Sequence, residues 1–195
     1  IGYFTTQKQL NQTLKLTAPT AAVTPVDTTP AIISTADWQI YHSDLYNYNI
    51  KLPSDWRPIE HSSNFANITS YRAPDDSYVE IIATQVPSTQ TLDQYLTSLD
   101  KTSATAYEGQ PSIKVLSTSQ TTIDNYPAIE RIEERLAAGF TSPVTYTKIG
   151  NLIFSFSAIP ADNVQDGKAY ILYSRIISTF TTQQPTPTPT DNFSS

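Results

Sequence analysis

The sequence predicts an α+β protein in which helices cover both faces of an antiparallel sheet of about six to eight strands, an α/β/α sandwich. Three features indicate this fold. Residues 46–52 alternate apolar and polar side chains, residues 78–86 are apolar on both faces, and residues 91–106 and 162–180 carry apolar stripes at helical spacing. Strands and helices of these lengths require one shared core.

Residues 46–52 form the clearest strand, because every second side chain is apolar and these side chains fall on one face: Tyr46, Tyr48, Ile50 and Leu52. Pro53 cannot donate a backbone hydrogen bond, so pairing should end there. Trp56 follows closely enough to fold back over the rim of the sheet. The segment therefore predicts a half-buried strand with an aromatic lid.

The run 78–86 is predicted to be the most buried strand, since it needs cover on both faces. A turn at 73–77 precedes it, with Pro and Asp where a tight reversal favours them. The hairpin 144–149 and 152–159, joined by Gly150-Asn151, is the clearest strand pair. It should direct Phe154 and Phe156 into the core.

Further strands are expected at residues 38–41, 67–72, 113–123 and 128–136. In the last of these, Ile129, Ile132 and Leu136 also fit a helix, but the preceding turn Asp124–Pro127 favours a hairpin strand.

The first helix should begin at Thr91, because Thr91 and Gln94 have the spacing of a capping box. Its apolar stripe comprises Leu92, Tyr95, Leu96 and Leu99. The second helix should begin at Asp162 and present a wider stripe to the sheet: Ala169, Leu172, Tyr173, Ile176, Ile177 and Phe180.

The pattern Tyr48-x-Ile50-x-Leu52-Pro53-x-x-Trp56 resembles the opening of the PsbP-like domains, which include the extrinsic PsbP proteins of photosystem II and Ran-binding import factors. The inferred order of later elements is similar, over about residues 37–182. The resemblance implies an antiparallel sheet between helices and a non-catalytic domain that docks onto other proteins. No metal- or partner-contacting residue of the family matches a position of this sequence.

The chain divides into three parts: a Thr/Pro-rich stalk or arm over residues 1–36, a folded domain over 37–182, and a Pro-Thr-rich linker or tail over 183–195. The flanks are too polar and too rich in Pro to build a core. Ile1-Gly2-Tyr3-Phe4 fits the outer end of a membrane anchor preceding Ile1, and equally an ordinary apolar terminus or a signal-cleavage scar.

Composition narrows the function. The chain carries 12 Lys and Arg against 18 Asp and Glu, a net charge of −6, which argues against nucleic acid as a partner. It has no Cys, which excludes disulfides and thiol chemistry. Charged residues make up only 15% of the chain, and its many Ser and Thr residues suit an extracellular or cell-surface protein.

Candidate glycosylation sites are the Asn residues of three acceptor tripeptides and the Thr residues of the C-terminal Thr-Pro run: Asn11, Asn67, Asn192, Thr186, Thr188 and Thr190. Each tripeptide also arises often by chance. Glycans on these side chains would fit a surface stalk.

No reaction motif is present, and no cofactor or metal is expected. His42 and His61 are the only near-neutral proton carriers, and both lie in polar loop sequence. A Ser-His-Asp hydrolase using Ser43 or Ser62 is the least favoured hypothesis. The paired carboxylates at 75–76, 133–134 and 162/166 are better explained as a turn, a charged strand face and a helix start.

A candidate interaction surface is Arg131, Glu133 and Arg135, which would line one face of a strand as alternating ion pairs, with Tyr46 and Tyr71 as exposed aromatics near strand ends. The alternative is a solvated face or a charged edge strand. The preferred function is a non-catalytic extracytoplasmic protein-interaction domain tethered at the cell surface. The second is a subunit of a surface fibre or sheath that self-assembles through its N-terminal arm.

Overall fold

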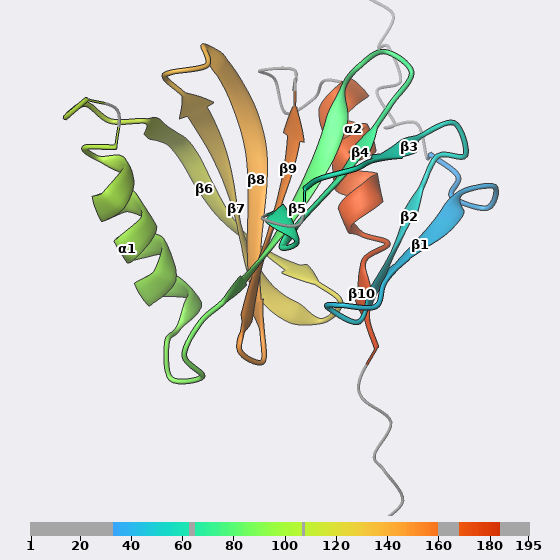
Figure 1. Ribbon diagram of the computed structural model, residues 1–195, viewed down its shortest axis with the longest axis horizontal. Helices are drawn as coiled ribbons and strands as arrows, with labels where there is room; N and C mark the ends of the chain where they lie inside the picture. Colours follow the sequence, from blue (N-terminus) through green and yellow to red (C-terminus); the bar gives the residue numbers. More distant parts are fainter. Residues whose placement is uncertain (1–32, 63–64, 107, 160–167, 184–195) are drawn as a thin grey trace, which may run out of the picture. The chain divides into compact units, whose positions relative to one another are not determined.

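The structure is a computed structural model that describes residues 33–62, 65–106, 108–159 and 168–183. These residues belong to one compact unit, which contains two helices and ten strands in the described part of the chain (Figure 1). The helices are α1 (Leu92–Ser103) and α2 (Lys168–Ile177). The strands are β1 (Gln39–Ser43), β2 (Tyr48–Leu52), β3 (Arg57–Ile59), β4 (Ile68–Arg72), β5 (Tyr78–Gln85), β6 (Ile113–Ile123), β7 (Tyr126–Arg135), β8 (Phe140–Ile149), β9 (Leu152–Ile159) and β10 (Thr181–Thr182).

The strands form two antiparallel sheets. The larger has seven strands in the order β3-β4-β5-β9-β8-β7-β6, and the smaller has three in the order β1-β2-β10. The prediction of one sheet is therefore wrong for residues 39–52. Pro53 ends β2 as expected, and the Trp56 amide then bonds back to the Pro53 carbonyl at 3.0 Å, so the chain turns into the edge of the other sheet.

Adjacent residues of β9 contact different helices. Phe154 belongs to a core that includes Tyr173 and Ile176 of α2, whereas Ile153 packs with Leu96 of α1. Because neighbouring side chains of a strand point to opposite faces, the large sheet has two distinct faces. We call the Phe154 side the aromatic face and the Ile153 side the groove face.

The aromatic face is closed by α2 and by the small sheet. Tyr48 of β2 lies with its ring centroid 5.1 Å from Phe180 and 5.9 Å from Phe154. Phe180 also contacts Phe156 at 4.9 Å, and all four side chains are fully buried. Tyr48, Ile50 and Leu52 bury one face of the strand as predicted, although in a separate sheet, and Tyr46 lies before the strand.

Several local predictions are confirmed. Thr91 and Gln94 form a complete capping box at the start of α1. Residues 126–135 are strand and not helix, and positive φ angles at Asp124 and Asn125 give the tight reversal before them. Gly150 (φ 62°) turns β8 into β9. The predicted start of the second helix at Asp162 lies outside the described residues.

The most buried strand is β8, and not the segment 78–86. Residues 142–147 of β8 are all buried, because Val144 and Tyr146 pack against α1 while Thr145 accepts a hydrogen bond from Tyr173 of α2. On β5 only the aromatic-face residues are buried: Val79, Ile81 and Ala83. The opposite face of β5 is left partly open, and the buried side chain of α1, Leu96, packs with Val144 and Tyr146 of β8.

Candidate functional site

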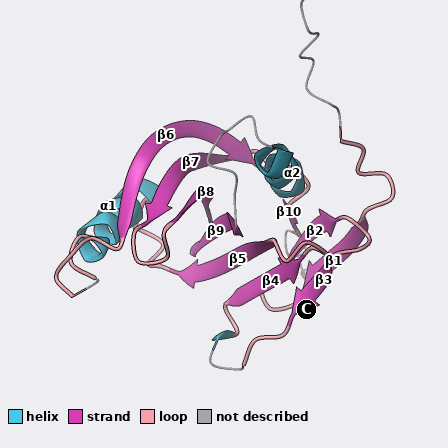
Figure 2. Ribbon diagram, turned by 90° about the horizontal axis from the view of Figure 1, so that it is seen from above, coloured by secondary structure: helices cyan, strands magenta, loops and turns pink. Residues whose placement is uncertain are grey.

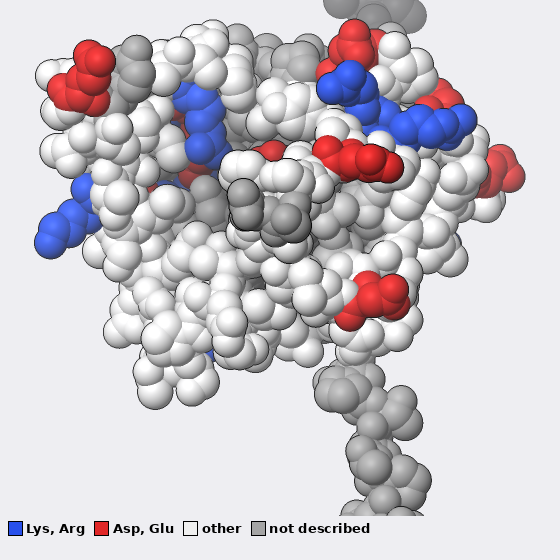
Figure 3. All heavy atoms as spheres, viewed as in Figure 1, with Lys and Arg blue, Asp and Glu red and all other residues white. Residues whose placement is uncertain are grey.

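A groove of about 430 Å³ opens between α1 and the groove face of the large sheet. Its floor comes from alternate residues of β5 and β9, which include Ile82, Thr84 and Ser155. Tyr95 and Leu99 of α1 form one wall. Figure 3 shows a hollow on this side of the molecule, with charged groups at one end and mostly uncharged surface around it.

Half-buried apolar side chains converge on this groove from five elements: Ile82, Leu99, Ile113, Phe140 and Ile159. A strand's alternation brings Ile82 and Ile159 to the same face, and the β7–β8 turn brings Phe140 beside them. A groove of this volume with a few polar groups among apolar ones has the composition of a binding site.

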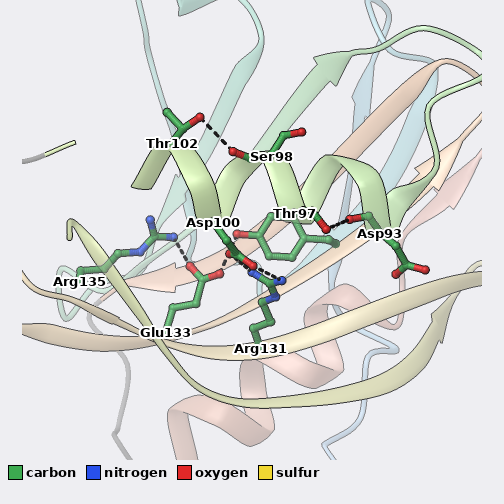
Figure 4. Close-up of polar contacts among 9 residues, drawn as sticks. Asp93, Thr97, Ser98, Asp100, Thr102, Arg131, Glu133 and Arg135 are labelled. Carbon is green, nitrogen blue, oxygen red and sulfur yellow. Dashed lines mark hydrogen bonds and ion pairs between the residues drawn. The ribbon is translucent and has the colours of Figure 1, made fainter. Parts of the chain in front are cut away.

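The groove is bordered by a group of charged side chains between α1 and β7, which we call the charged cluster: Asp100, Arg131, Glu133 and Arg135. Arg131 and Asp100 pair in a bidentate manner, with Nη1 donating to Oδ1 at 2.6 Å and Nη2 donating to Oδ2 at 3.1 Å (Figure 4). The Arg131 side chain is only 9% exposed, so Asp100 neutralises a nearly buried cation.

Glu133 is fully buried within the charged cluster. Its Oε1 accepts a hydrogen bond from the Tyr146 hydroxyl at 2.9 Å, and its Oε2 lies 3.0 Å from Arg135 Nη2 in an ion pair that lacks the alignment of a hydrogen bond. Burial raises the pKa of the Glu133 carboxyl, and the nearby Arg135 only partly opposes this. Tyr146 and Arg135 both line the groove, so they connect the buried carboxyl to its surface.

The sequence-based interaction surface is only partly brought together. Arg131, Glu133 and Arg135 do share one face of β7, but Arg131 and Glu133 are buried under α1 and cannot serve as an exposed docking surface. The alternative of a solvated or edge strand is also wrong, because β7 lies between β6 and β8. Only Arg135, whose side chain is 31% exposed, reaches the groove.

The two tyrosines lie away from the groove. Tyr71 is buried in the aromatic-face core, where its ring is 4.8 Å from that of Tyr41, and Tyr46 packs partly buried against the same core. The prediction of Tyr71 as an exposed contact is wrong, since β4 turns it inward. The groove-lining residues of β5 were missed by sequence reasoning, because that strand was expected to be covered on both faces.

The histidines do not complete a catalytic triad in the described residues. His42 Nε2 lies 3.1 Å from Asp44 and its Nδ1 lies 2.9 Å from Asn49 Oδ1, with no serine in this set. His61 Nε2 lies 2.9 Å from the hydroxyl of Ser70, with no carboxylate paired to it in the described chain. The Ser43 and Ser62 pairings considered from sequence are not formed.

Within the residues that the structure describes, no group of three or more His, Asp or Glu side chains is placed to hold a metal ion. In the same residues, neither helix has the length and apolar character needed to cross a bilayer. Asn67 is half-buried in the loop before β4, and the other candidate glycosylation sites, Asn11, Asn192, Thr186, Thr188 and Thr190, lie outside the described residues.

No protein-family model matches the sequence, and no curated protein matches it. Solved structures do resemble the fold. The solution structure of cyanobacterial PsbP (CyanoP) from Synechocystis sp. PCC 6803 superposes with a TM-score of 0.56 at 16% identity, covering 82% of this chain and 100% of CyanoP. The molecule is therefore an α+β protein built on an antiparallel sheet, and its particular fold is PsbP-like, as the Tyr48–Trp56 pattern predicted.

Two further structures show the same fold at greater distance. A protein of Bacteroides thetaiotaomicron VPI-5482 has a TM-score of 0.50 at 18% identity, covering 76% of this chain and 49% of its own. PA94 of Pseudomonas aeruginosa has a TM-score of 0.50 at 10% identity, covering 76% and 99%. At these identities the likeness concerns the fold alone.

Proposed function

We propose that this chain is a non-catalytic protein-interaction domain, held at a cell surface outside the cytoplasm, that takes an apolar segment of a partner protein into the groove beside α1. The observation that carries the proposal is the convergence of half-buried apolar side chains around a groove of about 430 Å³. Such side chains gain from burial by a partner.

The charges around the groove favour a polypeptide as the partner. Arg135 lines the groove as a cation and Glu80 as an anion, so the groove offers one group of each sign beside its apolar side chains. A protein segment carries both signs of charge, whereas a nucleic acid would be repelled by the net charge of −6. PsbP, whose fold the chain shares, supports this class of function by analogy.

The proposed binding mode also depends on where the two helices lie relative to the large sheet. We infer that α1 and α2 cover opposite faces of the large sheet, because Ile153 and Phe154 of β9 contact different helices. This arrangement leaves α1 free to form a groove wall while α2 closes the main core. The placement outside the cytoplasm rests on the hydroxyl-rich, Cys-free composition and on the Thr/Pro-rich flanks.

A photo-crosslinking residue tests the groove. With benzoylphenylalanine in place of Phe140, irradiation of the source cells should yield one discrete adduct, identified by mass analysis. The same probe in place of Leu45, which is 67% exposed and outside the groove, is the matched control. The adduct should disappear when Ile82→Arg fills the groove. Equal adducts from both positions, or an adduct unaffected by Ile82→Arg, would refute the groove as a docking site.

A fibre or sheath subunit that assembles through its N-terminal arm is the second candidate function, and the Thr/Pro-rich residues 1–36 favour it. A hydrolase is third. Esterase and glycosidase assays should show no activity that His42→Ala or His61→Ala removes.

A further inference from the structure

The outermost strand on one side of the large sheet, β6, is long and open. It pairs with β7 along one edge, and among the described residues no other strand pairs with its second edge. All residues from Lys114 to Thr122 are exposed. Figure 2 shows β6 as the outer rim of the sheet. Its second edge thus presents a row of backbone N–H and C=O groups that could pair with another strand.

The opposite edge of the same sheet is built differently. There β3 spans only Arg57–Ile59, and it contains a proline, Pro58, and a charged residue, Arg57. Short length, proline and charge are the features by which natural sheets prevent their edges from pairing. The two edges of one sheet therefore contrast in the property that controls association.

The central part of β6 lacks these protective features. A bulge at Leu116 shifts the register between Val115 and Ser117, and beyond it Ser117–Ile123 pairs regularly with β7. Those seven residues, STSQTTI, contain no charge, no proline and no glycine. The charges that flank this segment are engaged within the chain: Asp124 accepts hydrogen bonds from the amide and hydroxyl of Thr182, and Lys114 lies 3.6 Å from Glu134 of β7. A regular and uncharged edge of this length favours strand addition.

We propose that this edge of β6 pairs with the β6 edge of a second copy of the chain, antiparallel and centred on Gln120, to give a two-fold symmetric dimer with a continuous sheet. Two-fold symmetry places Gln120 opposite its own copy and sets Thr118 opposite Thr122. No like charges meet in this register, so the strand is complementary to itself. The pairing does not depend on the groove.

A second copy fits this edge better than an unrelated segment, because the surface is uncharged and so offers no charge pattern with which to select a different partner. A two-fold pairing also occupies the β6 edge of each copy, so no third copy can add to that edge. The remaining outer edge, β3, is protected. The expected state is therefore a dimer and not a filament.

Cysteine cross-linking of the full chain tests the register. The sequence contains no Cys, so a single introduced thiol reports only its own neighbour. Gln120→Cys should form a disulfide-linked dimer under mild oxidation, because residues opposite each other across a two-fold strand pair lie within disulfide distance. Gln85→Cys, at an exposed end of the central strand β5, is the matched control and should stay monomeric on a non-reducing gel.

Equilibrium sedimentation of the full chain tests the dimer itself. Gln120→Lys places two ammonium groups opposite each other and should raise the dimer dissociation constant about tenfold or more, whereas Gln85→Lys should leave it unchanged. Circular dichroism confirms that both variants fold. A monomer at all concentrations, an open-ended polymer, or a dimer that withstands Gln120→Lys but is lost on removal of residues 1–32 would overturn the proposal. Any of these results would leave partner capture by the groove intact.

Discussion

The two faces of the large sheet are built from the same strands but differ in how completely they are packed. The aromatic face buries Phe154 and Phe156 completely beneath α2 and the small sheet. The groove face has a smaller core around Leu96 and Ile153, the four residues of the charged cluster and an open groove. One face is filled by apolar packing, while the other keeps polar groups and unfilled space.

This difference indicates where stability and binding reside. Apolar side chains buried without voids contribute the most to the free energy of folding. A buried carboxyl such as Glu133 and a half-covered apolar groove contribute little or oppose folding, so they are expected where they serve another purpose. The following substitutions test this division, from the largest expected effect to the smallest.

Phe156→Ala on the aromatic face should lower the free energy of unfolding by about 3–5 kcal/mol, because it opens a cavity among Phe154, Phe180 and Tyr173. Urea unfolding measures the change. Phe140→Ala, which removes the same ring from the rim of the groove, is the matched control and should cost roughly 1 kcal/mol. Equal losses at both positions would contradict the division between the faces.

Asp100→Ala should lower the free energy of unfolding by about 2 kcal/mol, since it leaves the nearly buried Arg131 guanidinium without its partner. The loss is smaller than for a fully buried pair because Asp100 is itself 49% exposed. Asp93→Ala on the same helix is the control for the loss of one acidic residue. If adding Arg131→Met to Asp100→Ala restores no stability, the pair is not the cause.

Glu133→Gln should change how stability depends on pH. The pKa of Glu133 is raised above its ordinary value of 4.5, so the folded protein holds this proton more tightly than the unfolded chain does. Its contribution to stability is therefore full below about pH 4.5 and is lost as the pH rises through the raised pKa. Glutamine stays neutral and avoids this loss.

Thermal unfolding measured from pH 4 upward should thus show the melting temperature of Glu133→Gln increasing relative to that of the wild type as the pH rises. The control is Glu134→Gln, whose side chain is 38% exposed and pairs with Lys114. Parallel pH profiles for Glu133→Gln and the wild type would mean that burial does not govern this carboxyl.

Ile82→Thr should have the smallest effect on stability, below about 1 kcal/mol, because Ile82 is half-buried and threonine keeps the branched shape that suits a strand. It should nevertheless lower the yield of the crosslinked adduct from the probe at position 140, since it replaces an apolar side chain of the groove with one that carries a hydroxyl. The buried Ile81→Thr on the opposite face should do the reverse, with a large loss of stability.

Local sequence patterns alone determined most elements of this protein. The alternation of Tyr48, Ile50 and Leu52, the capping box at Thr91 and the turn at Asp124-Asn125 all predict the observed local structure, because each depends on contacts a few residues apart. The PsbP-like fold was likewise indicated by the residues from Tyr48 to Trp56.

Tertiary structure alone decided which elements share a sheet and which faces are covered. The local sequence of β2 does not determine whether the strand joins the small sheet or the large one. Its alternation shows only that one face of the strand is buried. The bidentate pair of Asp100 with Arg131 and the burial of Glu133 both depend on where α1 lies across β7. Asp100 and Arg131 are more than thirty positions apart in the chain. Long-range packing, which periodicity does not encode, formed the groove.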